Sequence, residues 1–199
     1  MEKNLKIILI FGAIILFLLV WLIYSSIKQE EISSINISTG INPPKSNINS
    51  QIKIIEFGDF KCPACKSAHP IINEIIEKYN ASLYFRNFPL KMHGEISYKA
   101  SLAAECANEQ NKFWEYHNLL YENQETFNEQ SLKQFASQLQ LNEAKFNNCL
   151  DTEKYKSQVQ EDINEAVSFG IKGTPTYFIN GVQVLGADKE KIEEIIKRI

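Results

Sequence analysis

The chain has 199 residues and a formal net charge of −3, and hydrophobic residues make up 44% of it. A chain of this length can form one domain of ordinary size, and the mild negative charge offers no basic surface for nucleic acid. We therefore expect no DNA or RNA partner.

The first feature along the chain is an apolar segment. Residues 7–24 (IILIFGAIILFLLVWLIY) carry no charge and have about the length that a helix needs to cross a bilayer. A cleaved signal peptide is the alternative, but the run is long for the apolar region of such a peptide and no A-x-A site follows it. We therefore predict a transmembrane anchor that places residues 7–24 in the lipid bilayer.

The charges that flank this segment predict its orientation. Two lysines precede it, whereas Lys28 after it is followed directly by Glu30 and Glu31. Because positive charge favours the cytoplasmic side, residues 1–6 should be cytoplasmic and the remaining chain extracytoplasmic. We expect a single-pass protein of the cell membrane whose outer part can keep disulfides.

The segment after the anchor changes character twice. Residues 25–50 are rich in Ser, Asn, Ile, Gly and Pro without a helical period, which predicts a linker, with a short strand over 35–41 as an alternative. Residues 52–57 (IKIIEF) are almost wholly apolar, as in a strand buried on both faces. Apolar residues then recur at helical spacing up to Tyr79, so this strand should lead into a helix, which Pro70 should kink.

The rest of the chain continues the α/β pattern. Residues 83–88 (LYFRNF) read as a second strand, and Asn180-Gly181 predicts a hairpin turn within residues 176–185. A helix capped by Asp188 ends the chain. Between the two halves we expect helices at 95–110, 112–123, 129–139, 142–149 and 152–169. This order predicts one α/β domain over 51–199 with a helical insertion at about 94–169.

Two cysteines stand at the predicted start of the first helix, in the stretch KCPACK. A helix amino terminus lowers the pKa of a thiol, because unpaired N–H groups and the helix dipole favour negative charge there. Cys62 occupies that place and is the predicted nucleophile. Cys65, one turn further into the helix, can close a disulfide with it and suits the resolving role. Pro63 fits the first helical turn, where its missing N–H group costs nothing.

Two other residues are candidates for the same site. Glu56 interrupts an apolar strand, where a buried carboxylate would have a raised pKa and could relay the proton of Cys65. The alternative is a glutamate at a sheet edge that faces solvent. Thr174 and Pro175 precede the hairpin, and the proline either opens a strand or forms a cis bond that turns the backbone toward the redox centre.

The two remaining cysteines lie on predicted helices. Cys106 and Cys149 could be small buried core residues. Two cysteines left over in an oxidising compartment more often pair, and closing a loop of that length would stabilise the fold by about 3 to 4 kcal/mol. We therefore predict a structural disulfide.

A metal site is an alternative for the first pair. Cys62 and Cys65 together with His69 could supply three ligands, but a structural zinc site takes four, and no second pair at that spacing follows. We expect no metal and no other cofactor. His93 and His117 are interpreted as structural, and His69 as a residue that could tune the thiol of Cys62.

The ordered set of motifs resembles a known superfamily. The string E-F-x-x-F-x-C-P-x-C from Glu56 to Cys65, the later Pro70 and the distant T-P before the hairpin resemble the thioredoxin superfamily. The helical block between the halves, with A-A-E-C-A followed by F-W-E-Y-H, is similar to membrane-tethered DsbA-like thiol-disulfide oxidoreductases of bacteria. The resemblance covers about Gln51 to Ile199.

The resemblance implies a fold and a set of site residues. It implies a thioredoxin fold interrupted by a helical insertion, with Cys62 as the exposed nucleophile and Cys65 as its partner. It also implies that Glu56 is the buried carboxylate and that Pro175 is a cis-proline, with Thr174 and Pro175 binding the substrate. Some tethered relatives carry a second cysteine pair, which supports the predicted structural disulfide.

The resemblance also implies an activity and its partners. The enzyme would introduce disulfides into secreted or envelope proteins with free thiols, and a membrane redox partner would reoxidise Cys62 and Cys65. Pro63-Ala64 between the cysteines replaces the Gly-Pro of typical reductases and favours an oxidant. A reductase or isomerase of the same fold is an alternative, since a threonine before the proline, as at Thr174, also occurs in isomerase relatives. A non-enzymatic metal-binding or tethered binding module is a second alternative.

Overall fold

The computed structural model describes residues 12, 14–22 and 35–199, and the chain divides into two units, Met1–Ser33 and Ser34–Ile199. In the first unit, residues 12 and 14–22 are helical and the large apolar side chains among them are exposed. No helix among the described residues is long and apolar enough to span a membrane. The predicted anchor over 7–24 lies partly outside the described residues, and residues 1–6 lie wholly outside them.

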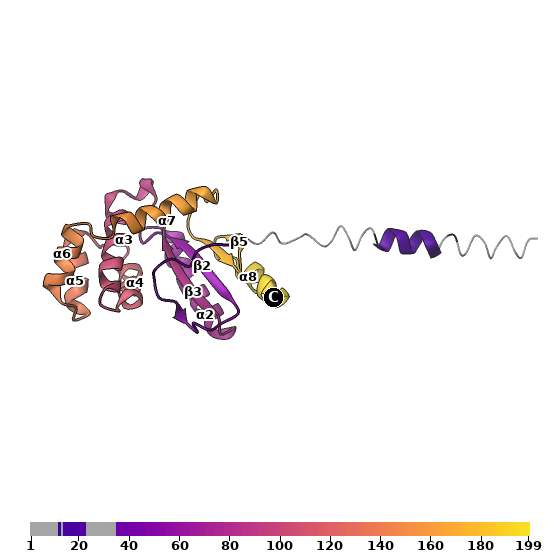
Figure 1. Ribbon diagram of the computed structural model, residues 1–199, viewed down its shortest axis with the longest axis horizontal. Helices are drawn as coiled ribbons and strands as arrows, with labels where there is room; N and C mark the ends of the chain where they lie inside the picture. The colour runs from indigo at the N-terminus through magenta and orange to yellow at the C-terminus, as the bar shows by residue number, and fades with distance from the viewer. Residues whose placement is uncertain (1–11, 13, 23–34) are drawn as a thin grey trace, which may run out of the picture. The chain divides into compact units, whose positions relative to one another are not determined.

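The second unit is built on a mixed sheet (Figure 1). Its strand order is β1-β3-β2-β4-β5, with β2 parallel to β3 and every other neighbouring pair antiparallel. The strands are β1 (Lys45–Ser46), β2 (Lys53–Gly58), β3 (Ser82–Asn87), β4 (Thr176–Ile179) and β5 (Val182–Leu185). β2 is central and all of it is buried except Lys53, as the apolar run predicts for a strand covered on both faces.

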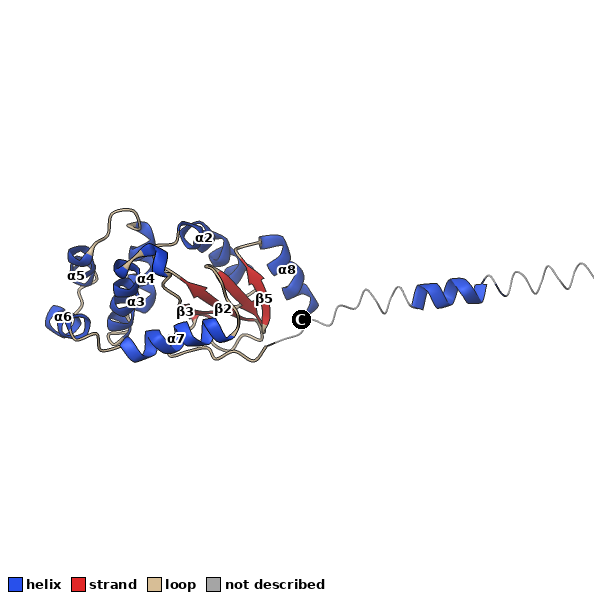
Figure 2. Ribbon diagram, turned by 90° about the horizontal axis from the view of Figure 1, so that it is seen from above, coloured by secondary structure: helices blue, strands red, loops and turns tan. Residues whose placement is uncertain are grey.

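Helices cover both faces of this sheet, as Figure 2 shows. They are α2 (Pro63–Lys78) and α8 (Lys189–Arg198) on one face and α7 (Lys156–Ser168) on the other. Successive side chains of a strand point to opposite faces, so Ile54 packs with the isoleucines of α2 and α8, whereas Ile55 and Phe57 pack with residues of α7. The predicted cap of the last helix is present, since Asp188 accepts a hydrogen bond from the backbone of Lys191.

The helical insertion gathers at one end of the sheet (Figure 1). It contains η1 (Lys91–His93), α3 (Glu95–Asn108), α4 (Phe113–Glu122), α5 (Glu129–Gln138) and α6 (Glu143–Asp151), after which α7 returns along the sheet. The five helices predicted between residues 95 and 169 are therefore confirmed as α3 to α7. Large aromatic side chains such as Phe113, Tyr116 and Phe146 form their shared core.

The segment before β2 differs from the predicted linker. Residues 35–50 pack on the rest of the second unit: Ile37 and Asn42 are buried, and β1 pairs antiparallel with β3. The strand therefore forms at residues 45–46 and not within 35–41. The Asn42 side chain explains part of this packing, because it donates to Glu105 at 2.9 Å and to the carbonyl oxygen of Phe85 at 3.2 Å.

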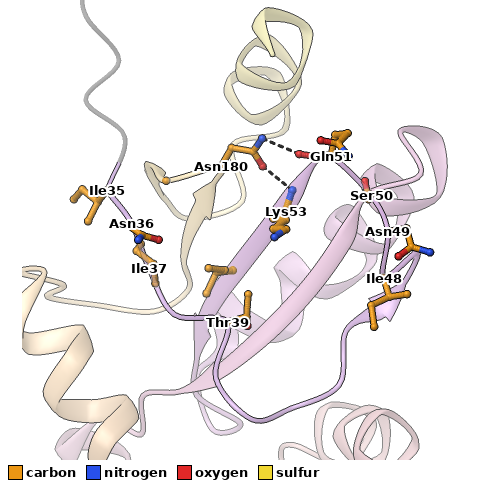
Figure 3. Close-up of a pocket in the computed structure, with 12 residues that line it drawn as sticks. Ile35, Asn36, Ile37, Thr39, Ile48, Asn49, Ser50, Gln51, Lys53 and Asn180 are labelled. Carbon is orange, nitrogen blue, oxygen red and sulfur yellow. Dashed lines mark hydrogen bonds between the residues drawn. The ribbon is translucent and has the colours of Figure 1, made fainter.

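Figure 3 shows how this segment meets the hairpin turn. A pocket of about 640 Å³ lies between residues 35–39, residues 48–51 and the turn. Asn180 bridges to β2, since its Oδ1 accepts from the backbone N–H of Lys53 at 2.7 Å and its Nδ2 donates to the carbonyl oxygen of Gln51 at 2.9 Å. The turn of the hairpin thus fixes the start of β2.

Candidate active site

Cys62 lies at the point where β2 gives way to α2. It is the N-cap residue of α2, with φ −79° and ψ 117°, and Pro63 is the first helical residue. Its backbone N–H donates to the carbonyl oxygen of Asp59 at 3.0 Å, and its own carbonyl oxygen accepts from the backbone of Lys66 at 3.2 Å. The strand-to-helix turn therefore holds the sulfur at the amino terminus of α2, where the first N–H groups of the helix have no partner within the helix.

The two thiols of the site are free in this structure and differ strongly in their proton affinity. Hydrogen bonding by the Cys65 thiol, and then by the Thr174 hydroxyl and by backbone N–H groups, lowers the pKa of Cys62 to about 5 against the opposing effect of burial. Burial raises the pKa of Cys65 well above its usual range. Neutral pH therefore favours the thiolate of Cys62 and the neutral thiol of Cys65, the difference that the predicted roles of nucleophile and partner require.

Cys62 is more enclosed than the resemblance implied. Its exposed fraction is 6%, and that of Cys65 is zero. The enclosing group is the turn before β4, because the Sγ atom of Cys62 lies 3.3 Å from the carbonyl oxygen of Thr174. An attacking thiol therefore has little of this residue to approach.

The register of the sheet places this turn beside the cysteine. Thr176, the first residue of β4, pairs with Phe57 near the end of β2, so the two preceding residues reach the start of α2. The bond between Thr174 and Pro175 is cis. The Thr174 hydroxyl is buried without a hydrogen-bond partner, so it is available to donate to the thiolate of Cys62, whose pKa it lowers.

Glu56 lies on β2 and interacts electrostatically with both cysteines. Its exposed fraction is 2%, so the interpretation of a solvent-facing glutamate is wrong. Burial raises the pKa of Glu56 to about 8, an effect that the positive charge of Lys45 partly opposes. Lys45 comes from β1 and donates to Asn73 on α2 at 2.8 Å. At neutral pH the carboxyl group therefore holds a proton close to Cys65.

Sequence reasoning missed a second buried carboxylate, Asp59. Its side chain accepts hydrogen bonds from the backbone N–H groups of Lys61 at 2.7 Å and Leu90 at 2.8 Å and from the Ser97 hydroxyl at 2.5 Å. Asp59 thereby ties the active-site turn to the start of the helical insertion. Its only signal in the sequence is a charged residue between the two phenylalanines of FGDF.

The three histidines lie in different surroundings. The Nδ1 atom of His93 donates to the carboxylate of Asp59 at 2.7 Å. His117 is fully buried among aromatic rings, with the ring centroid of His69 at 5.1 Å. Burial lowers the pKa of His69 to about 4, so it is neutral at physiological pH. Among the described residues no group of three His, Cys, Asp or Glu side chains is arranged to hold a metal ion.

The remaining predicted pair lies in the helical insertion. Cys106 on α3 and Cys149 on α6 form a disulfide with an S–S distance of 2.02 Å. The structure therefore separates the cysteines by role, with one pair joining two helices and the other free at the helix start.

A free C-x-x-C pair at a helix amino terminus, beside a cis-proline on a sheet of this topology, defines a thioredoxin-like dithiol centre. Residues 47–198 match the family described as thioredoxin, and the chain belongs to this family. Lys45 and the residues before it lie outside the matched region.

The chain is similar to several named proteins. The chain is 28% identical over 166 residues to disulfide bond formation protein D of Bacillus subtilis, covering 75% of this chain and 73% of that protein. It resembles the crystal structure of oxidised BdbD from the same organism with a TM-score of 0.70 and 27% identity, covering 83% of this chain and 95% of that one. It is also 30% identical over 152 residues to Na(+)/H(+) antiporter NhaA 3 of Salinispora tropica. That match covers 74% of this chain but only 23% of the antiporter, so the chain spans about a quarter of that relative.

Proposed function

We propose that this chain is a thiol-disulfide oxidoreductase that introduces disulfides into secreted or envelope proteins by exchange at Cys62 and Cys65. The observation that carries the proposal is the position of Cys62, where hydrogen bonding lowers its pKa to about 5. Stabilising the thiolate stabilises the reduced form, which makes the disulfide form a strong oxidant. The names of the Bacillus relatives point to the same chemistry.

The exchange begins from the oxidised form. A client thiolate attacks the Sγ atom of Cys62, a mixed disulfide forms, and the bond to Cys65 breaks. The departing sulfur of Cys65 takes a proton, which Glu56 can supply because its carboxyl group is neutral and buried beside it. Cys62 is the sulfur that the client reaches, since Cys65 is fully buried.

A second client thiolate completes the cycle. It attacks the client sulfur of the mixed disulfide, which closes the client disulfide and releases Cys62 as a thiolate. The client loses two electrons and two protons. The cysteine pair gains both electrons but only one proton, which Cys65 takes from Glu56, because Cys62 leaves as a thiolate; the protons of the client pass to solvent, which reprotonates Glu56. A membrane redox partner then removes two electrons from the dithiol and restores the Cys62 to Cys65 bond.

The enzyme works outside the cytoplasm, anchored by residues 7–24 with residues 1–6 inside the cell. The support is the uncharged apolar sequence of that segment and the excess of lysine before it. Membrane fractions of cells that express the full chain, or a form without residues 1–34, test the anchor. Only the full chain should stay in membranes after alkaline washing, and equal release of both forms would contradict the proposal.

Trapping of the mixed disulfide tests the activity. In Cys65→Ala the Cys62 thiolate can still attack a client disulfide, the reverse of the step that releases Cys62, and no Cys65 thiol is present to release the adduct, so adducts that dithiothreitol removes should accumulate in cells. The double variant Cys62→Ala/Cys65→Ala is the matched control and should show none. Recovering no adducts from Cys65→Ala would contradict the proposal.

The reduction potential separates an oxidase from a reductase or isomerase of the same fold. A potential at or above that of glutathione is expected for an enzyme that oxidises its clients. A potential near that of thioredoxin would assign the reductase instead. Bound metal after mild purification, together with an ordinary pKa of Cys62, would favour the non-enzymatic module.

A further inference from the structure

One buried amide side chain of the helical insertion donates to the backbone of the active-site turn. Gln124 lies in the loop between α4 and α5, residues 123–128, and its exposed fraction is 2%. Its Nε2 atom donates to the carbonyl oxygen of Phe60 at 3.0 Å and to that of Cys62 at 2.9 Å. Both acceptors belong to the short segment that carries the nucleophile.

These two bonds fix the orientation of the amide. Turning the amide over would bring its Oε1 atom against the two carbonyl oxygens, where no hydrogen bond can form. In the observed orientation Oε1 is buried without a partner. An unsatisfied buried acceptor is unfavourable, so the position of Gln124 is set by the active-site carbonyls and not by its own surroundings.

A lysine holds the loop from the other side. The Nζ atom of Lys61 donates to the backbone carbonyl oxygen of Gln124 at 2.6 Å and lies 4.6 Å from the ring centroid of Phe127. Contacts therefore run in both directions between the segment 60–62 and the loop 123–128. The two cannot move independently without breaking several of these contacts.

The carbonyl group of Cys62 is the link to the chemistry. It accepts both the bond from Gln124 and the opening bond of α2, from the backbone of Lys66 at 3.2 Å. The direction of this carbonyl group fixes ψ of the N-cap residue, and with it the place of the sulfur relative to the N–H groups of the first turn. Those N–H groups are among the donors that favour the thiolate.

We propose that Gln124 is a positioning residue that holds the N-cap conformation of Cys62, so that the helical insertion sets the redox properties of the dithiol. The inference rests on the proposed function only in taking the Cys62 thiolate to be the group that exchanges disulfides with clients. Gln124 does not touch the reacting sulfur and acts through the backbone of Cys62.

Titration of the thiolate in Gln124→Ala tests this role. The ultraviolet absorbance of the thiolate, measured against pH in the reduced chain, reports the pKa of Cys62 without any client. Losing a positioning hydrogen bond should raise this pKa by about one unit, a tenfold change in the ratio of thiolate to thiol at a given pH. The equilibrium constant for oxidation of glutathione should fall about tenfold with it, because the reduced form is less stabilised.

Thr126→Ala is the matched control from the same loop. The Thr126 hydroxyl is exposed and bonds only within the loop, to the carbonyl oxygen of Asn123 at 3.3 Å, so the variant should keep the pKa of the unaltered chain. Circular dichroism and urea unfolding show whether each variant is folded.

Gln124→Asn provides a second test should the alanine variant not fold. Its amide fills much of the same space but is one methylene too short to reach both carbonyl oxygens, so the pKa of Cys62 should again rise. Either folded variant with an unchanged pKa would overturn the inference. If the pKa of Cys62 shifts in the Gln124 variants but Cys65→Ala yields no client adducts, the proposed function is contradicted and the role of Gln124 is not.

Discussion

The carbonyl oxygen of Thr174 lies 3.3 Å from the sulfur of Cys62, although the two residues are 112 positions apart in the sequence. The sheet brings them together, because β2 and β4 are neighbours and Phe57 pairs with Thr176. The carbonyl oxygen can only accept, and it accepts from the Cys62 thiol. The donors that favour the thiolate come in two sets, one from the start of its own helix and the other the Thr174 hydroxyl in the turn before β4.

Replacing Thr174 tests the second set of donors. Thr174→Val keeps the volume of the side chain but removes the hydroxyl that favours the thiolate. The pKa of Cys62 should rise by about one to two units, the effect of one hydrogen bond to a charged group. Thr174→Ser keeps the hydroxyl and should stay near the unaltered value. Equal values for the two variants in a thiolate titration would show that the hydroxyl has no part.

Replacing Glu56 changes how stability depends on pH. Burial raises the pKa of Glu56 from 4.5 to about 8, so the folded chain keeps this proton over a range in which the unfolded chain has lost it. Folding takes up a proton there, and the contribution of Glu56 to stability falls as pH rises from about 4.5 to 8. Glu56→Gln should remove this loss and stabilise the chain by a few kcal/mol above pH 8, with little change near pH 4.

The same variant should slow the exchange. The amide that Glu56→Gln introduces would offer Cys65 no acidic proton, so the step in which Cys65 leaves should become slower by about 10² to 10⁴, as for loss of a general acid. Urea unfolding at several pH values and single-turnover oxidation of a model peptide measure the two effects. Parallel stability profiles for Glu56→Gln and the unaltered chain would contradict the raised pKa.

The disulfide of the helical insertion should stabilise the fold without taking part in exchange. Cys106 and Cys149 are 43 residues apart, and closing a loop of this length stabilises a protein by about 4 kcal/mol in the chain-entropy account. Cys106→Ser/Cys149→Ser should lose about that amount in urea unfolding and keep the pKa of Cys62. A variant as stable as the unaltered chain would show that the bond has no such role.

The buried side chain of Arg86 joins the sheet both to α7, through an ion pair, and to the segment before β2, through a hydrogen bond. Arg86 on β3 donates to Asp162 on α7 at 2.7 Å and to the carbonyl oxygen of Ser38 at 2.6 Å, and it also pairs with Glu165. Arg86→Met would leave the buried Asp162 carboxylate with hydrogen bonds from Asn87 and Gln158 but without its charged partner, which should destabilise the chain by about 3 to 5 kcal/mol.

An exposed arginine serves as the control for this variant. Arg198 forms an ion pair with Glu194 on the surface of α8, and Arg198→Met should change the free energy of unfolding by no more than about 0.5 kcal/mol. Similar losses for both arginine variants would contradict the importance of the buried pair.

The sequence predicts those parts of the fold and site that depend on local patterns. The apolar run before KCPACK predicts β2, and the cysteine spacing at a helix start predicts a thiolate at Cys62. The five insertion helices follow from helical periodicity. These features can be predicted from the sequence because each depends on residues close together in the chain.

Contacts between segments that are distant in the chain could not be predicted from the sequence. Residues 35–50 look like a linker by composition, yet Asn42 finds its partners on β3 and α3, which no local pattern reveals. Asp59 and Gln124 carry no motif, and their roles depend on donors and acceptors brought together by the fold. Such residues become visible only when the hydrogen-bond partners of each buried polar group are known.

The pKa of Cys62 in the reduced chain tests the central claim most directly. Ultraviolet thiolate absorbance, followed from acid to alkaline pH and corrected with the oxidised chain, gives this value in one titration. The account predicts a midpoint near pH 5. A midpoint at the ordinary thiol value of about 8.5 would contradict it, because the dithiol would then have no reason to be more stable than the disulfide.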